Sequence, residues 1–80
     1  MKDYFYQVKY GDNRSHWLFG RFANKNAVMA SDKGKVLKVL TTKQLIENHT
    51  EDEVRAIARN CLVYQVHALG EFPEDVAKLL

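Results

Sequence analysis

The sequence predicts a single α+β domain, residues 1–80, built on an antiparallel β-meander of three to five strands. Helices are expected to pack on one face of the sheet, and one of them is expected at the C-terminus. Three observations support this fold class. Aromatic and β-branched residues alternate with period two near the N-terminus, which is typical of strands. Signals that start helices follow after residue 40. The length suits one domain, and a composition of 46% hydrophobic and 28% charged residues is that of a folded globular chain.

The first two elements are predicted to form a β-hairpin. Apolar residues occupy every second position of the first strand: Tyr4, Tyr6, Val8 and Tyr10. Residues 11–14, Gly-Asp-Asn-Arg, have the composition of a turn, because glycine and asparagine tolerate a positive φ. Residues 16–23 are again rich in aromatics and predict the second strand.

Two interpretations fit residues 24–34. In the first, which we favour, Ser31 to Lys35 form a turn with Gly34 in the left-handed region, joining strands over residues 27–31 and 35–40. In the second, Asn24 caps a short helix over residues 25–33 and Gly34 ends it. Residues 36–40 are a strand under either interpretation.

Two helices are predicted next. Thr41 and Thr42 can cap a short helix that contains Leu45, and Thr50 with Glu53 has the spacing of a capping box. An apolar stripe with helical spacing then follows at Val54, Ile57, Ala58 and Cys61. Glu51 and Arg55 are spaced to form an ion pair across one helical turn. We expect this helix to end at Asn60.

The last two elements are predicted to be a strand and a helix. Residues 62–67, Leu-Val-Tyr-Gln-Val-His, alternate in the manner of a strand. Pro73 suits the first turn of a helix, and that helix would carry apolar residues at the end of the sequence: Val76, Ala77, Leu79 and Leu80.

Charge and targeting signals limit the class of protein. Residues 1–43 carry a formal charge of +6 and residues 44–80 a charge of −4, giving +2 in total, which is too weak to diagnose nucleic-acid binding. The first residues are polar, and no apolar run approaches the length of about 20 residues that spans a membrane. A single cysteine suits a reducing compartment. We therefore expect a cytoplasmic protein that has no contact with membranes.

The sequence offers no catalytic or cofactor-binding constellation. The histidines His16, His49 and His67 lack metal-ligand spacing, although His16 and His67 could meet across neighbouring strands. Cys61 ends an apolar helical stripe, which predicts a buried structural thiol. The four glycines stand alone and form no phosphate loop. We therefore expect no enzyme activity, no cofactor and no metal.

The aromatic hairpin is the candidate binding surface. Seven of the nine aromatic residues fall within the first 22 positions, so both faces of the hairpin carry them. Trp17, Phe19 and Arg21 share one face of the second strand, and a buried unpaired guanidinium is costly. We therefore expect Trp17 and Phe19 to be partly exposed beside Arg21, with Leu18 and Phe22 in the core. The basic side chains Lys9 and Lys38 would complete this surface.

The segment from residue 36 to residue 67 resembles small uncharacterised proteins of phages and prophages from Gram-positive bacteria. The aromatic hairpin, the TEDEVRAI helix and the CLVYQV strand give this resemblance. It implies a cytoplasmic accessory protein that binds a host or phage component, and it assigns no functional residue.

The function expected from these observations is that of a small non-catalytic binding module. It would bind a protein or a second copy of itself through the aromatic hairpin, because tyrosine, tryptophan and arginine are enriched at protein interfaces. A symmetric homodimer is the commonest form of self-association. The alternative is nucleic-acid binding by the basic N-terminal half, with bases stacked on exposed aromatics. No small-molecule substrate is evident.

Overall fold

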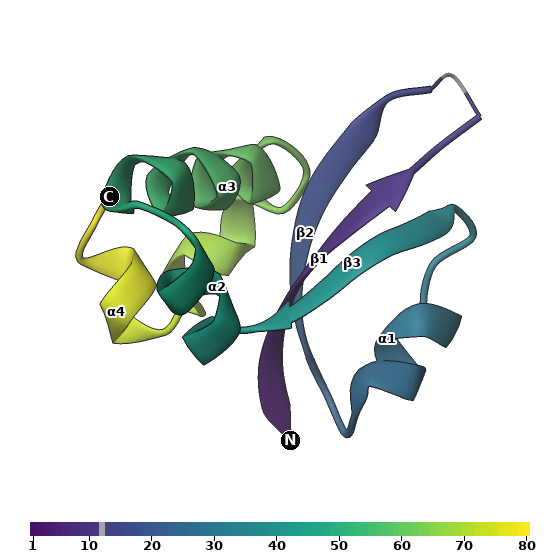
Figure 1. The fold of residues 1–80 in the computed structure, drawn as a ribbon, viewed down its shortest axis with the longest axis horizontal. Helices are drawn as coiled ribbons and strands as arrows, with labels where there is room; N and C mark the ends of the chain where they lie inside the picture. Colours follow the sequence, from purple (N-terminus) through teal and green to yellow (C-terminus); the bar gives the residue numbers. More distant parts are fainter. Residues whose placement is uncertain (12) are drawn as a thin grey trace.

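The fold, seen in a computed structural model that describes residues 1–11 and 13–80, is an antiparallel three-stranded sheet with helices on both faces (Figure 1). The strands are β1 (Lys2–Lys9), β2 (Ser15–Phe22) and β3 (Lys35–Thr41), in the spatial order β2-β1-β3. This confirms the α+β class, the antiparallel sheet and the predicted hairpin. The order differs from that of a sequential meander, because β3 pairs with β1 and leaves β2 as an edge strand.

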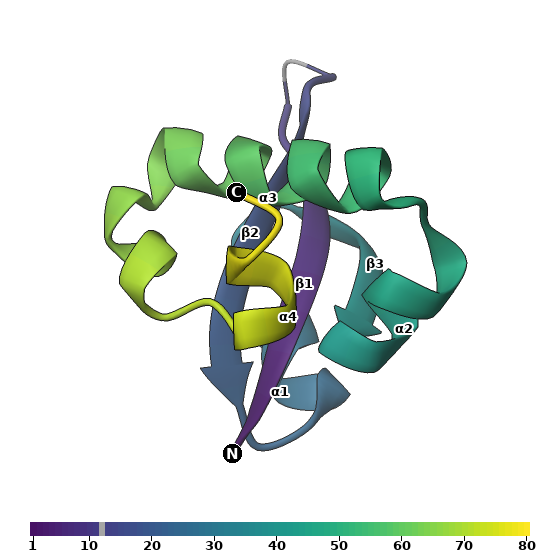
Figure 2. The same cartoon turned by 90° about the vertical axis from the view of Figure 1, so that its left-hand side faces the viewer.

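The helices divide between the two faces of the sheet. They are α1 (Lys25–Ala30), α2 (Thr42–Asn48), α3 (Glu51–Tyr64), the 3₁₀ helix η1 (Val66–Gly70) and α4 (Glu74–Ala77). In Figure 2, α3 runs across the strands and α4 lies in front of β1, whereas α1 lies behind the sheet. The prediction of helices on one face therefore holds for α2, α3 and α4 but not for α1.

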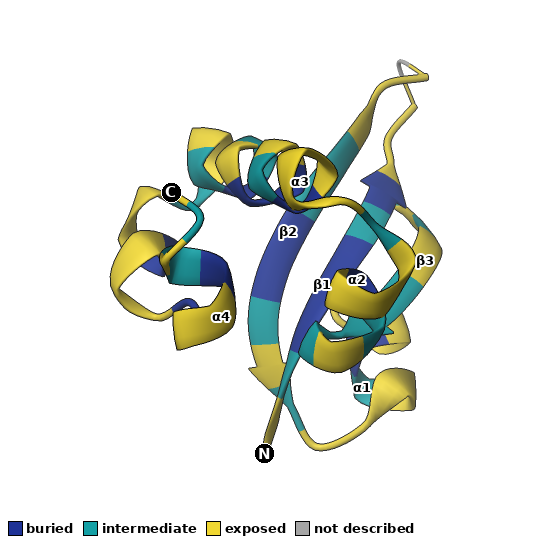
Figure 3. Cartoon of the chain, turned by 60° about the vertical axis from the view of Figure 1, so that its left-hand side comes forward, coloured by how far each residue is buried: buried dark blue, intermediate teal, exposed yellow. Residues whose placement is uncertain are grey.

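Strand alternation produces two separate hydrophobic clusters. Figure 3 shows the buried segments of β1 and β2 that contribute to them. The larger cluster surrounds Phe5 and Phe19, whose ring centroids are 4.9 Å apart, and Phe72 from the C-terminal segment packs on both rings. The smaller cluster joins Val28 of α1 to the opposite face of the sheet, with Tyr4, Tyr6, Val8 and Leu18. Most of the aromatics of the hairpin are therefore core residues.

Residues 24–34 contain helix α1, so the favoured hairpin interpretation is wrong. The Asn24 side chain accepts a hydrogen bond from the Ala27 amide at 2.9 Å and caps the helix. Val28 is completely buried on the smaller cluster, and that burial favours a helix over a strand here. Gly34 does not have a positive φ. A Cβ at position 34 would lie 2.5 Å from Val8 and 2.9 Å from the Tyr10 ring, so glycine is required there by close packing.

Helix α3 continues to Tyr64, so the predicted stop at Asn60 and the predicted strand over residues 62–67 are both wrong. The residues expected on that strand form the end of α3 and part of η1. Leu62 extends the buried face of α3 onto the larger cluster, and this packing outweighs the β propensity of the segment.

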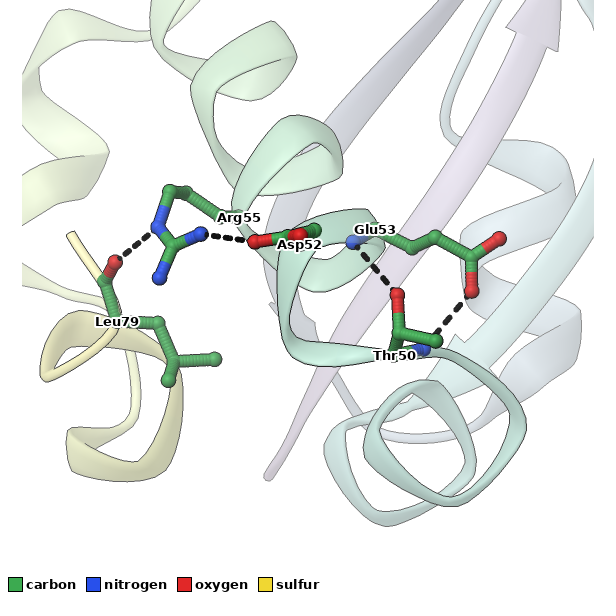
Figure 4. A network of polar contacts seen from close by, with 5 residues as sticks. All are labelled: Thr50, Asp52, Glu53, Arg55 and Leu79. Carbon is green, nitrogen blue, oxygen red and sulfur yellow. Dashed lines mark hydrogen bonds and ion pairs between the residues drawn. The ribbon is translucent and has the colours of Figure 1, made fainter.

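Both predicted threonine caps are present. Thr41 and Thr50 each accept a hydrogen bond from the third helical residue and receive its side chain in return. Figure 4 shows the Thr50–Glu53 pair beside Arg55. Arg55 pairs with Asp52 at 2.6 Å, rather than with Glu51, and donates to the Leu79 carbonyl at 2.6 Å. The arginine thereby ties the C-terminal segment to α3.

Candidate functional site

The predicted binding residues do not form one exposed surface. Phe19 is only 4% exposed and belongs to the larger cluster, so the expectation that it is partly exposed is wrong. Arg21 is exposed at the end of β2, where its Nε lies 2.8 Å from an Asp3 carboxylate oxygen. The guanidinium thus lies beyond the part of this face that the helices cover, and it does not force Phe19 into solvent.

Trp17 is half-buried and packs against the larger cluster. This agrees with the expectation that Trp17 is partly exposed. Its backbone and that of Phe19 lie on the outer edge of β2, where they bond to side chains of α3 and its C-cap. The Trp17 amide donates to Asn60 Oδ1 at 2.6 Å. The Phe19 amide donates to Gln65 Oε1 at 2.8 Å, and Gln65 Nε2 donates back to the Phe19 carbonyl at 2.9 Å. Two amide side chains therefore occupy the edge of β2 at which another strand could pair.

Lys9 and Lys38 are exposed and lie on one face of the sheet with Trp17. The register pairs Gln7 with both Trp17 and Lys38, and directly opposed residues point to the same face. The register shifts between Gln7 and Val8, which leaves Leu37 as an extra residue in β3. Because of this bulge, Lys35 also points to the face of Lys38, opposite Lys9. Simple alternation would have placed Lys35 and Lys38 on opposite faces.

A shallow hollow of about 450 Å³ lies where the hairpin end meets the turn between α1 and β3. We call it the lysine hollow, and its described lining is Lys9, Tyr10, Gly11, Asn13, Lys33, Gly34 and Lys35. Asn13 has a φ of 65° in the hairpin turn, in keeping with the turn composition. Three of these described lining residues are lysines and none of them is acidic.

A second exposed feature is apolar. Val63 and Tyr64 end α3, Val66 and Leu69 lie in η1, and these four side chains are each more than half exposed. We call them the α3–η1 patch. Residues three apart eclipse in a 3₁₀ helix, so Val66 and Leu69 lie on the same side of η1. In the sequence, the only feature that draws attention to this segment is the alternating pattern that predicted a strand.

A third feature is a hollow of about 290 Å³ between α2, α3 and α4. Its lining mixes Ile46, Val54 and Leu79 with charges of both signs: Glu51, Asp75 and Lys78, beside His49. The His49 ring bonds the Leu45 carbonyl through Nδ1 at 2.9 Å. The opposite charges partly cancel, so this hollow favours no particular class of ligand.

The histidines and the cysteine have structural surroundings. Within residues 1–11 and 13–80, no group of three metal-ligating side chains comes together. His16 packs against Tyr10 and Tyr64, with ring centroids 5.4 and 4.5 Å away. His67 lies in η1 and not on a neighbouring strand. Cys61 is completely buried, as predicted, and burial raises the pKa of its thiol to about 12.

None of the described helices has the length and apolarity needed to cross a membrane. No protein-family model, curated protein or solved structure matches the chain.

Proposed function

We propose that this protein is a non-catalytic binding module that self-associates through the α3–η1 patch. The observation that carries the proposal is the exposure of four large apolar side chains within seven residues. Val63 is 67% exposed and Val66 is 77% exposed. Single exposed apolar residues are ordinary, but a contiguous group of them is typical of an interaction surface.

The charges beside the patch favour a second copy of the chain as the partner. Arg59 lies one turn before Val63 on α3, and Glu71 follows η1; both side chains are exposed. In a two-fold symmetric dimer, every contact between two different residues occurs twice, once on each side of the axis. Antiparallel packing of two patches would bring Arg59 of one copy toward Glu71 of the other, on both sides of the axis.

The size of the molecule sets the expected strength. A stable interface buries about 800 Å² on each partner, which is roughly a sixth of the 5161 Å² surface of this chain. Four side chains supply only part of that area. We therefore expect reversible, concentration-dependent association, with a dissociation constant between about 1 μM and 1 mM.

Sedimentation velocity over that concentration range tests the proposal. Val66→Glu should shift the monomer–dimer midpoint at least about tenfold to higher concentration, because it would place a charge in the interface. Met29→Glu is the matched control: Met29 is 53% exposed on α1, far from the patch, and the charge change is the same. A strict monomer at about 1 mM, or equal shifts in both variants, would refute self-association through this patch.

A further inference from the structure

The two edge strands of the sheet differ in how their outer backbone groups are bonded. On β2, the Trp17 and Phe19 amides bond to side chains of α3 and its C-cap. On β3, the Thr41 amide bonds to Gln44 Oε1 at 3.0 Å, at the point where the strand ends. Among residues 1–11 and 13–80, no other side chain bonds to the backbone of β3. The part of β3 before Thr41 is therefore an edge with which another strand could pair.

The alternation of ladder hydrogen bonds identifies a residue whose backbone groups β3 turns outward. Phe19 faces away from β1, so its neighbour Leu18 bonds to its partner in β1, Tyr6. Tyr6 thus directs both backbone groups to β2, and its partner on the other side, Val39, receives no bond from β1. The outward-facing Thr41 amide agrees with this alternation. Within the described part of the chain, Val39 therefore presents an unpaired N–H and C=O at the edge of β3.

One face of β3 carries positive charge. Lys35 and Lys38 are exposed, and the register places them on the same face of the sheet. Neither lysine belongs to an ion pair with another described residue. Lys35 lies directly opposite Lys9 of β1, and like charges in that position destabilise a sheet. Carboxylates on the outer side of β3 would therefore be attracted to both lysines of the strand.

The opposite face of β3 is apolar. Val36 and Val39 are only partly buried, and they pack against the smaller cluster. Leu37, at the bulge between them, is 43% exposed. Apolar side chains of an added strand would extend this cluster, because directly opposed residues of neighbouring strands point to the same face. The edge of β3 thus suits a strand in which acidic and apolar residues alternate.

We propose that β3 binds an extended acidic segment of another protein as a fourth strand of the sheet. Carboxylates of that segment lie opposite Lys35 and Lys38, and its apolar side chains lie opposite Val36 and Val39. In this mode of recognition, backbone hydrogen bonds supply affinity and alternate side chains supply specificity. A second copy of β3 is a poor partner, because antiparallel pairing would bring its own lysines to the face of Lys35 and Lys38, and lysines on an edge strand oppose self-pairing.

A labelled peptide of alternating glutamate and valine, titrated into the full chain at low salt, tests the proposal. We expect a dissociation constant between about 10 μM and 1 mM, because the bulge at Leu37 leaves only a short regular length for pairing. The Val39 amide should gain protection from hydrogen exchange in the complex, whereas the Trp17 amide, already bonded to Asn60, should not change. No binding at about 1 mM peptide, or binding that leaves Val39 unprotected, would overturn the proposal.

Two control peptides separate strand pairing from charge attraction. The residue opposite Val39 is a valine of the peptide, so replacing every valine by proline keeps the charge and removes the donors that face β3. This peptide should bind at least about tenfold more weakly. A peptide of alternating lysine and valine keeps the strand propensity and reverses the charge, and it should also bind more weakly. An affinity equal to that of the glutamate–valine peptide, for either control, would contradict the proposed mode of binding.

A charge reversal on β3 locates the site. Lys35→Glu/Lys38→Glu should weaken binding of the glutamate–valine peptide by roughly 2- to 30-fold, the range for two lost cross-strand ion pairs, and the variant should prefer the lysine–valine peptide. The matched control Lys2→Glu/Lys25→Glu makes the same change of net charge at exposed residues outside β3, and it should keep the wild-type preference. The same response in both double variants would overturn the assignment to β3.

A second copy of the chain at this edge would give a different result. Protection of the Val39 amide would then rise with the concentration of the chain in the absence of peptide, and that outcome would overturn an acidic partner. The exchange measurement uses the wild-type chain, so it does not depend on the folding of a variant. β3 and β2 are opposite edges of the sheet, and Val66→Glu should bind the peptide as the wild type does. This inference and the proposed self-association can therefore fail separately.

Discussion

The Gln65 side chain covers the open edge of β2 at a single residue, Phe19, so its removal should have a local effect on stability. The Gln65 amide makes two hydrogen bonds to one residue, accepting from the Phe19 amide and donating to the Phe19 carbonyl. Gln65→Leu removes both bonds and leaves a side chain of similar length. The Trp17 amide keeps its bond to Asn60, so the change acts on one position of the strand.

The expected loss of stability follows from these contacts. Each hydrogen bond of this kind contributes about 0.5–1.5 kcal/mol net, so losing two should lower the free energy of unfolding by about 2 kcal/mol. For a domain of this size, 1 kcal/mol corresponds to roughly 4–8 °C in the thermal midpoint. Gln65→Leu should therefore melt about 8–16 °C below the wild type.

Thermal and urea unfolding measure the loss, and amide exchange locates it. The Phe19 amide should lose protection in Gln65→Leu, whereas the Trp17 amide should keep it. Gln7→Leu is the control, because the Gln7 side chain makes no hydrogen bond within the described residues. Similar small losses in both variants, with Phe19 still protected, would refute the argument that Gln65 closes this edge.

Three further predictions concern the core and its helices. Phe19→Ala should cost about 3–5 kcal/mol in urea unfolding, because the ring packs between Phe5 and Phe72; a loss near 1 kcal/mol would mean that the site is open. The Thr50 backbone amide, and then its side chain, hold the pKa of Glu53 below its usual 4.5. The stabilisation by the Glu53 carboxylate is therefore fully present above the unfolded-state pKa of 4.5 and is lost as the pH falls through the lower folded-state pKa. Wild type and Glu53→Gln should differ in thermal midpoint at neutral pH and converge in acid. Cys61, with its thiol pKa raised to about 12, should react with a disulfide reagent only as fast as the protein unfolds; prompt labelling of the native protein would contradict its burial.

Local sequence signals predicted the elements that depend on local chemistry. The threonine caps, the stripe from Val54 to Cys61 and the turn of the N-terminal hairpin are each signalled by residues close to one another in sequence. The prediction of a strand after Cys61 is wrong for the opposite reason. Its alternation suits a strand, but Leu62 packs on the larger cluster and Gln65 bonds the edge of β2. Gln65 bonds a residue 46 positions away, and Leu62 packs on a cluster built from several elements. Periodicity in the sequence does not reveal either contact.

Strand alternation does not reveal how far along a strand face the helices extend, so it predicts the candidate site only in part. Phe19 and Arg21 do share a face, but α3 covers it near Phe19, while Arg21 lies beyond the helices beside Asp3. Lys9 and Lys38 were placed on a common surface by their charge. Lys35 joined them only through the bulge at Leu37, and a bulge leaves no signal in the alternation of apolar residues.

The strand order also has a kinetic consequence. Lys9 meets Ser15 across a loop that spans six positions of sequence, but it meets Lys35 across 26. Closing the longer loop costs roughly 1 kcal/mol more in chain entropy, so we expect the β1–β2 hairpin to form first and β3 to dock later. The core around Phe5 then still lacks Phe72 and Val76. Until those residues have been synthesised and have folded back, one apolar side of the hairpin stays open to water, and in that interval the chain is most exposed to aggregation.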